Sequence, residues 1–206
     1  LVDDTRMTKL RAGTDVFATG AMEQPAVFQN NDVPGVMLAS AAQRLMRRYA
    51  VKPFDSVILL TANADGYRAA LDFHDVGVTI TAIVDLRPGG EGSTLRTEVE
   101  KAGLSIRQGA TVYEALTSRD KTRVAGALVC PLDATGSPEL QQLERLPCDG
   151  IAVSVGWMPS AALPGQAGVT FTYDSKLEQF VPDTTPDGVF TAGRANGVYD
   201  RAARID

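Results

Sequence analysis

Apolar runs of strand length alternate with a helical pattern in the middle of the chain. Residues 56–61, SVILLT, form one such run, and residues 77–85, GVTITAIVD, form a β-branched run typical of a parallel strand buried on both faces. Between them, a helical pattern extends from about Asp65 to Asp75. Because strand, helix and strand follow one another so closely, they predict a βαβ unit with a right-handed crossover.

Further elements are indicated on both sides of this unit. An amphipathic helix is predicted from Val36, after the turn sequence NNDVPG, with an apolar face made of Leu38, Ala42, Leu45 and Tyr49. Beyond the unit, the pattern predicts a helix at 93–103, a third parallel strand at 104–107, an antiparallel hairpin or meander at 110–118 and 123–132, and a last strand at 151–155. The sequence therefore predicts an α/β fold, a three-layer Rossmann-like βαβ domain with a small antiparallel β meander.

Composition and charge narrow the range of partners. The chain is 44% apolar and 22% charged, which is ordinary for a globular protein. Its net charge of −5 and its lack of a basic tract argue against a nucleic-acid partner. No apolar stretch approaches the ~20 residues of a membrane span, and no signal segment opens the sequence. We therefore expect a cytoplasmic protein with neither a nucleic-acid nor a membrane partner.

Cysteines and carboxylates, the residue types that could carry redox or acid–base chemistry, show no pattern that indicates such a site. Cys130 and Cys148 are the only cysteines, and they are far from any C-x-x-C spacing. The sequence therefore predicts neither a metal site nor a dithiol redox pair. No carboxylate pair has a spacing that singles it out for acid–base work, so no catalytic residue is predicted.

The turn TANADG, after the first strand of the βαβ unit, occupies the place of a dinucleotide fingerprint. Thr61, Asn63 and Gly66 stand at the three glycine positions of G-x-G-x-x-G. Gly66 is a glycine at the third position of the motif, where the absence of a side chain lets helix and strand pack closely. Asn63 tolerates a left-handed conformation, yet its side chain fills space that a phosphate would need. Asp65 suits an N-cap but brings negative charge to the same place. A dinucleotide site, a damaged one, and a plain strand-to-helix turn all remain open.

Asp85 strengthens the nucleotide hypothesis. It ends the second strand of the unit, where an acidic side chain can bind the ribose hydroxyls of NAD and repel the extra phosphate of NADP. Because Arg87 follows two residues later, NADP, which carries the extra phosphate, is not excluded. The alternative for Asp85 is a solvated residue at a strand end. Tyr67, which opens the predicted helix, could cover the pyrophosphate or simply pack.

Several separated phrases share a further resemblance: FATGAMEQPAVFQNNDVPGVMLASAA at 17–42, IVDLRP at 83–88, AVSVGWMPS at 152–160, FVPD at 180–183 and VFTAGRANG at 189–197. Together they resemble the α subunits of heterotetrameric sarcosine oxidases. The wider group includes related subunits of proline and opine dehydrogenases and of hydrogen cyanide synthase. The resemblance runs over nearly the whole chain, and the 17–42 phrase is its most specific part.

The resemblance implies a two-dinucleotide-binding flavoprotein, in which a nicotinamide domain is inserted into a flavin domain. Residues 1–35 and 156–206 would then be partial flavin-domain segments, and 36–155 an NAD-binding Rossmann-like domain. The chain would be a central fragment that binds NAD but not FAD, because the flavin fingerprint of the complete protein is absent. The cofactor-binding residues that we expect are Thr61, Asn63, Gly66, Tyr67, Asp85, Gly156 and Gly193.

The activity implied by the resemblance is oxidative demethylation of sarcosine or a related secondary amine, with other subunits of a hetero-oligomeric amine oxidase as partners. This section alone is not expected to be active. One alternative is a vestigial, non-catalytic Rossmann-like module that serves subunit assembly. Another, a free-standing NAD(P)H-dependent reductase, lacks the redox cysteine pair. Arg194 departs from the acidic residue that many relatives carry, and it could meet a pyrophosphate or lie on the surface.

Overall fold

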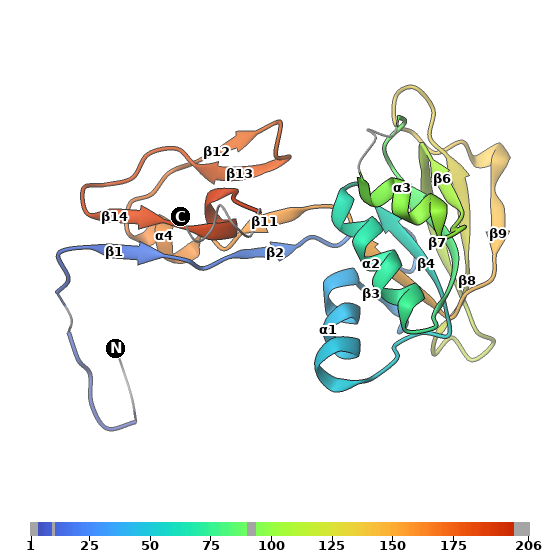
Figure 1. Ribbon diagram of the computed structural model, residues 1–206, viewed down its shortest axis with the longest axis horizontal. Helices are drawn as coiled ribbons and strands as arrows, with labels where there is room; N and C mark the ends of the chain where they lie inside the picture. The colour runs from blue at the N-terminus through green and yellow to red at the C-terminus, as the bar shows by residue number, and fades with distance from the viewer. Residues whose placement is uncertain (1–3, 10, 90–93, 200–206) are drawn as a thin grey trace. The chain divides into compact units, whose positions relative to one another are not determined.

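The computed structural model describes residues 4–9, 11–89 and 94–199 (Figure 1). Contacts divide the chain into two compact units. The larger unit is Glu23–Gly156, and the smaller unit joins the described residues up to Met22 with those from Trp157 onward. Each unit is considered by itself below.

A five-stranded parallel sheet forms the centre of the larger unit. Its order is β3 (Val36–Leu38), β10 (Gly150–Ser154), β4 (Ser56–Thr61), β5 (Thr79–Asp85) and β6 (Ile106–Gln108). From β4 the chain moves one way, to β5 and β6, and later returns on the other side of β4 as β10. The carboxyl ends of β4 and β10 therefore form a topological switch point, which is the usual ligand position in open α/β sheets.

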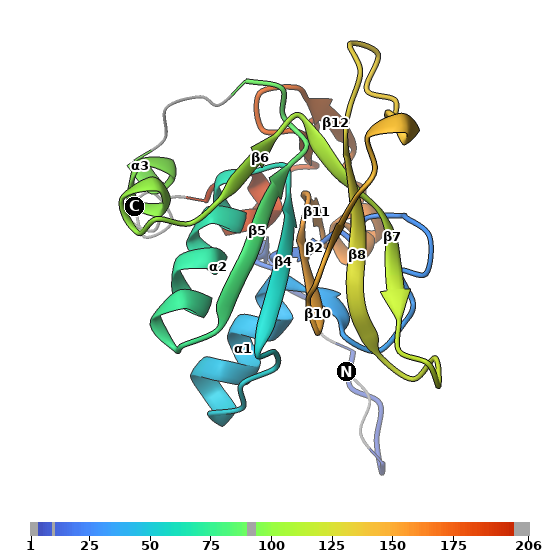
Figure 2. The same ribbon diagram turned by 90° about the vertical axis from the view of Figure 1, so that its right-hand side faces the viewer.

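Both faces of this sheet are covered, so the unit has three layers (Figure 2). The helices α1 (Ala39–Tyr49), α2 (Ala64–Asp75) and α3 (Thr94–Lys101) share one apolar cluster with the sheet. On the other face, the antiparallel meander β7 (Ala110–Thr117), β8 (Val124–Pro131) and β9 (Glu144–Leu146) shares a second cluster. A short 3₁₀ helix, η1 (Leu140–Gln142), precedes β9. The predicted α/β fold, with a parallel sheet and an antiparallel meander, is confirmed.

Most predicted elements of this unit are found within one or two residues of their expected bounds. The helix expected at 93–103 is α3, and Ser93 lies outside the described residues. The third parallel strand begins at Ile106 rather than at Leu104.

The predicted helix from Val36 is wrong in its first three residues. Val36–Leu38 is an edge strand that pairs in parallel with Ile151–Val153, and α1 begins only at Ala39. The buried residues of α1 are Ala39, Ala42 and Met46, whereas Tyr49 is 64% exposed. Pairing with a strand more than a hundred residues later in the sequence supplies hydrogen-bond partners that the local pattern does not reveal.

The smaller unit consists of short paired strands. The strand β1 (Asp15–Phe17) pairs in parallel with β14 (Val189–Thr191), and β12 (Phe171–Asp174) pairs antiparallel with β13 (Gln179–Pro182). The strand β2 (Ala21–Glu23) pairs with β11 (Trp157–Pro159). Helix α4 (Ala162–Gln166) and the 3₁₀ helix η2 (Gly193–Asn196) complete the unit.

The larger unit begins at Glu23 by its contacts, and the expected division of the chain at residue 36 into flavin and nicotinamide domains stays a prediction. The segment 23–35 belongs to the larger unit, where Ala26, Phe28 and Val33 pack against the cluster beneath the meander. Among the described residues, none of the helices has both the length and the apolarity needed to cross a membrane.

Candidate dinucleotide-binding site

Three strand ends meet at the carboxyl edge of the parallel sheet. Thr61, the last residue of β4, pairs with Ser154 of β10 on one side and with Asp85 of β5 on the other. Helix α2 starts at Ala64, three positions after Thr61, so its N-terminus lies at the switch point (Figure 1). Ser154 is the residue here that the sequence analysis missed. Its position as the last polar residue of an apolar strand, just before Val155 and Gly156, is the signal that could have found it.

Gly66 allows α2 to pack directly on β4. A Cβ atom at this position would lie 2.1 Å from Thr61 Oγ1 and 2.4 Å from Thr61 Cβ, which no real side chain tolerates. Both partners are rigid, since Thr61 is fully buried and Gly66 lies inside the first turn of the helix. The close helix–strand packing expected of the third fingerprint glycine is therefore present.

Asn63 caps α2 instead of adopting the left-handed conformation considered from the sequence. Its φ of −148° is extended, and its Oδ1 accepts a hydrogen bond from Gly66 N at 3.2 Å. Ser154 Oγ donates to the same oxygen at 3.3 Å. Asp65, which was also considered as the cap, lies in the first turn of the helix instead. A cap at Asn63 fixes the turn without placing a carboxylate at the N-cap position.

Thr61, Asn63 and Gly66 form what we call the turn end of the site. Thr61 Oγ1 accepts from Asn63 N at 3.2 Å, and carbonyl oxygens of Asn63 and Ser154 lie 2.9 and 3.0 Å from it. Asn63 Nδ2 is buried and has no hydrogen-bond partner among the described residues. An orphaned donor beside a helix N-terminus is chemically suited to an anionic oxygen.

Tyr67, Asp85 and Arg87 form a second group, the strand-end cluster. Asp85 is fully buried, and Arg87 closes over it with three donors: N and Nε to Oδ1, at 3.0 and 2.9 Å, and Nη2 to Oδ2, at 2.7 Å. The Tyr67 hydroxyl also donates to Asp85 Oδ2. The expected alternative of a solvated strand-end residue is therefore wrong for Asp85.

The charges of this cluster follow from its contacts. Burial acts to raise the pKa of Asp85, but hydrogen bonds from Arg87 and Tyr67 outweigh it and hold that pKa below its usual value. Burial, together with the hydrogen bond to Asp85, raises the pKa of Tyr67 to about 12. The cluster is therefore an ion pair capped by a neutral phenol at physiological pH.

These contacts decide which side chains of the cluster a ligand can reach. Both Asp85 oxygens are occupied, so direct contact with a ribose hydroxyl requires the Arg87 fork to open. Tyr67 was expected either to cover the pyrophosphate or to pack. Its side chain is only 1% exposed, so it packs in the interior of the structure. The Arg87 guanidinium lies 5.6 Å from the Tyr67 ring centroid, and the Arg87 side chain is 30% exposed. Arg87 is thus the accessible member of the cluster.

The expected cofactor residues are divided between the two units. Thr61, Asn63, Gly66, Tyr67 and Asp85 lie along one edge of the larger unit. Gly156 is the last residue of that unit, and nothing lies within 4 Å of a Cβ built on it. Gly193 belongs to the smaller unit, where it begins η2 with a φ of +67°.

Arg194 of the smaller unit is held between two aromatic rings. Its guanidinium carbon lies 4.5 Å from the Trp157 ring centroid and 5.2 Å from that of Tyr199. Stacking of this kind leaves the guanidinium edge able to donate hydrogen bonds. The Arg194 side chain is therefore held by two aromatic rings, and its contact with a pyrophosphate stays a prediction.

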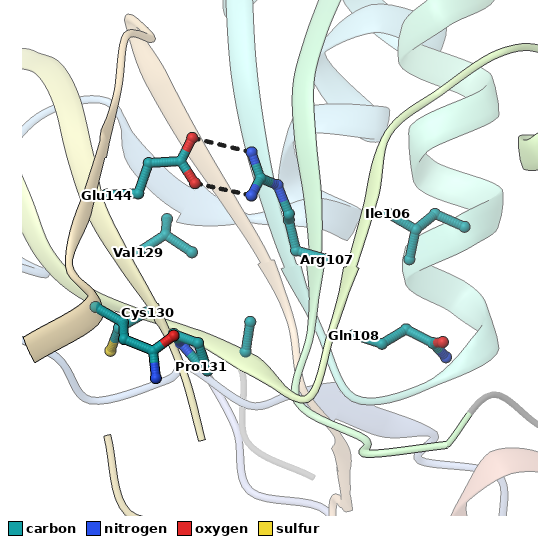
Figure 3. Close-up of a pocket in the computed structure, with 9 residues that line it drawn as sticks. Ile106, Arg107, Gln108, Val129, Cys130, Pro131 and Glu144 are labelled. Atoms are coloured by element: carbon teal, nitrogen blue, oxygen red, sulfur yellow. Dashed lines mark hydrogen bonds and ion pairs between the residues drawn. The ribbon is translucent and has the colours of Figure 1, made fainter. Parts of the chain in front are cut away.

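A cavity of about 420 Å³ lies between β6 and the meander, away from the turn end (Figure 3). Arg107 of β6 and Glu144 of β9 form a two-pronged ion pair across it, with distances of 3.0 and 2.8 Å. Cys130 lines the same cavity, and burial raises the pKa of its thiol, which disfavours the reactive thiolate. Among the described residues, no group of His, Cys, Asp or Glu side chains is arranged to hold a metal ion.

Comparisons with known proteins bear on the whole chain. No protein-family model matches it. The chain is 29% identical over 204 residues to the sarcosine oxidase subunit alpha of Corynebacterium sp. (strain P-1), covering 99% of this chain and 20% of that protein. It is 30% identical over 199 residues to the same subunit of Rhizobium meliloti (strain 1021), covering 96% and 18%. The resemblance to sarcosine oxidase subunit alpha is confirmed.

The chain spans about a fifth of the length of these relatives. Among solved structures, the thioredoxin reductase of T. acidophilum matches with a TM-score of 0.69 and 18% identity, over 92% of this chain and 60% of that one. At this identity the match speaks for the fold alone. It agrees with the Rossmann-like fold described above.

Proposed function

We propose that this chain is the nicotinamide-dinucleotide-binding section of a flavin-dependent amine oxidoreductase resembling sarcosine oxidase subunit alpha. The observation that carries the proposal is the turn end. At the switch point of a parallel sheet, a glycine whose replacement would force a Cβ against Thr61 brings a helix N-terminus close to a strand. A pyrophosphate binds at this place in dinucleotide folds, because helix N-termini attract anions.

The residues present fit such a cofactor. Asn63 Nδ2 and the first-turn amides of α2 would hold the pyrophosphate, and Arg87 would lie toward the adenosine ribose. Gly66 and Thr61 would act indirectly, by fixing the distance between helix and strand. Asp65 opposes the binding of a dianion, so the affinity is expected to be modest. When bound, the nicotinamide nucleotide would supply hydride chemistry.

The wider activity is proposed for the longer protein. The match to sarcosine oxidase subunit alpha supports FAD as a second cofactor, oxidation of sarcosine or a related secondary amine, and further subunits as partners. In this proposal, residues 1–35 and 156–206 belong to the flavin domain, with Gly156 and Gly193 near the flavin side. Residues 36–155 bind the nicotinamide nucleotide.

Two observations favour a second candidate function. Asp85, the residue expected at the ribose, is buried and saturated with donors, and Asp65 brings negative charge to the turn. A vestigial nucleotide site in a module that serves subunit assembly would have the same features. The two candidates make opposite predictions for cofactor binding.

Calorimetric titration of the protein with NAD and with NADP separates them. The diagnostic variant is Asn63→Asp, which keeps the cap acceptor for Gly66 N but adds a negative charge at the turn end. The matched control is Asn196→Asp, which adds the same charge at an exposed position of the smaller unit and keeps the acceptor for the Thr191 hydroxyl.

Saturable binding that Asn63→Asp weakens at least about tenfold, and Asn196→Asp leaves unchanged, supports the dinucleotide site. No binding of either nucleotide at millimolar concentration by the folded protein would refute it in favour of the vestigial module. Circular dichroism of each variant verifies that the fold is intact.

A further inference from the structure

The cavity between β6 and the meander has the size and the lining of a small-molecule site. Its volume of about 420 Å³ falls within the ~300–1,000 Å³ that such sites occupy. The charged residues that line it are Arg107 and Glu144, and Ala110, Val129 and Pro131 supply apolar surface. An apolar lining with a few charged groups is the usual composition of a pocket that orients a ligand.

The strands that form the cavity walls present neutral groups to it. Ala110 and Val129 are buried and belong to the apolar cluster that joins the sheet to the meander. Burial raises the pKa of the Cys130 thiol, so at physiological pH this side chain stays protonated and contributes as a small apolar group. The part of a ligand that contacts these walls must therefore be uncharged.

The two charged side chains are held by different strands. Arg107 is fixed by the pairing of β6 with β5, and Glu144 by the pairing of β9 with β8. Figure 3 shows the two side chains pointing toward each other, whereas Ile106 and Gln108 point away from the cavity. Because regular strands hold both groups, their positions are defined before any ligand arrives.

The ion pair between these side chains can open at little cost. The side chains are 42% and 48% exposed, and water screens the attraction between charges so exposed. A lone anion bound to Arg107 would face the negative charge of Glu144, and a lone cation bound to Glu144 would face Arg107. A zwitterion avoids both penalties, because its carboxylate takes the place of Glu144 on the guanidinium fork and its ammonium group takes the place of Arg107.

We propose that this cavity binds a free α-amino acid with an apolar side chain. The ligand carboxylate binds Arg107, the ammonium group binds Glu144, and the side chain contacts Ala110, Val129 and Pro131. The site is independent of the proposed dinucleotide site, because neither charged residue takes part in the turn end or the strand-end cluster.

The proposal is tested with L-leucine and three compounds that each lack one of its recognised groups. These are 4-methylpentanoate, which lacks the ammonium group, 3-methylbutylamine, which lacks the carboxylate, and glycine, which lacks the side chain. Titrations followed by the backbone amide NMR signals of β6 and β9 give both the dissociation constant and the location of binding. We expect L-leucine to bind at least about tenfold more tightly than each of the other three.

Two variants separate the roles of the charges. Glu144→Gln keeps an oxygen that can accept from Arg107 but removes the negative charge, so L-leucine should bind no more tightly than 4-methylpentanoate. Arg107→Gln is the reciprocal change, after which L-leucine should bind no more tightly than 3-methylbutylamine. The matched control is Glu100→Gln, which makes the same substitution in the ion pair of Arg96 and Glu100 on α3 and should leave all four dissociation constants within about twofold.

The proposal is overturned if L-leucine gives no saturable shifts at millimolar concentration, or shifts confined to other elements. It is also overturned if any of the three partial compounds binds as tightly as L-leucine, or if both charge variants keep the preference for the zwitterion. The heteronuclear spectrum of each variant verifies that the fold is intact. Titration with NAD and NADP remains a separate measurement, so failure here leaves the dinucleotide site standing.

Discussion

The turn end is made of backbone groups and short neutral side chains, whereas the strand-end cluster is an ion pair covered by a tyrosine. At the turn end, Thr61 and Gly66 are so close that geometry alone limits which residues fit. In the strand-end cluster, the side chains of Tyr67 on α2, Asp85 at the end of β5 and Arg87 just after it satisfy one another by charge and hydrogen bonds. Packing is therefore expected to govern the first region and electrostatics the second, and each prediction below tests one side of this comparison.

The largest effect is expected from Arg87→Ala as a single substitution. It removes the two side-chain donors of Arg87, Nε and Nη2, from the buried Asp85 carboxylate and leaves only the backbone N–H of residue 87. Removing the cationic partner of a buried ion pair costs about 3–5 kcal/mol of unfolding free energy. Urea denaturation measures this loss. Arg107→Ala breaks an ion pair whose side chains are 42% and 48% exposed, so it should cost no more than about 1 kcal/mol. Equal losses in the two variants would contradict the buried ion pair.

The next largest effect is expected from Gly66→Ala. The added methyl group meets Thr61 at 2.1 Å, and overpacking of this kind destabilises a protein by about 1–3 kcal/mol, occasionally more. Gly156→Ala is the control in the same unit, because nothing lies within 4 Å of its new Cβ, and it should stay within about 0.5 kcal/mol. If both substitutions were neutral by urea denaturation, the helix and strand would not pack as described.

A smaller loss is expected from Tyr67→Phe. The substitution keeps the buried ring and removes one hydrogen bond to the Asp85 carboxylate, which is worth about 1.5–3 kcal/mol when the acceptor is charged. Arg87 retains its own donors to Asp85, so the loss should fall at the low end of this range. A loss of unfolding free energy as large as that of Arg87→Ala would mean that the tyrosine stabilises the cluster as much as the arginine does.

Alkaline titration tests whether the phenol of Tyr67 is buried. The pKa of Tyr67 is raised in the folded protein to about 12, so its contribution to stability is complete below the ordinary value of 10.0 and is lost as pH rises toward 12. Absorbance at the phenolate band should therefore show one tyrosine that ionises late, and this step should be missing in Tyr67→Phe. An unchanged titration curve in the variant would contradict the buried phenol.

Acid titration tests Asp85, the other partner of the ion pair, whose contribution to stability is complete near neutral pH and changes only at low pH. The folded-state pKa of Asp85 lies below the ordinary 3.8, so the ion pair stabilises the fold above that pH and the contribution is lost as pH falls through the folded pKa. Stability curves of the unaltered protein and of Asp85→Asn should therefore converge below about pH 4. Parallel curves down to pH 2 would show that Asp85 is not a buried carboxylate.

The sequence by itself determined the elements whose signal is local. The apolar runs of β4 and β5, the helical pattern of α2 and the hairpin of β7 and β8 all follow from periodicity and turn residues. The role of Gly66 in helix–strand packing also follows locally, because only four residues separate it from Thr61. For the same reason, the motif predicts a candidate site at the carboxyl edge of the sheet.

Only the tertiary structure decided the features that depend on distant partners. Val36–Leu38 became a strand because β10 offers it hydrogen bonds, although its own pattern continues a helix. Asp85 became buried, and Arg87 accessible, because α2 brings Tyr67 over the end of β5. Sequence spacing can place a carboxylate at a strand end, but its exposure depends on which side chains the rest of the fold brings to it.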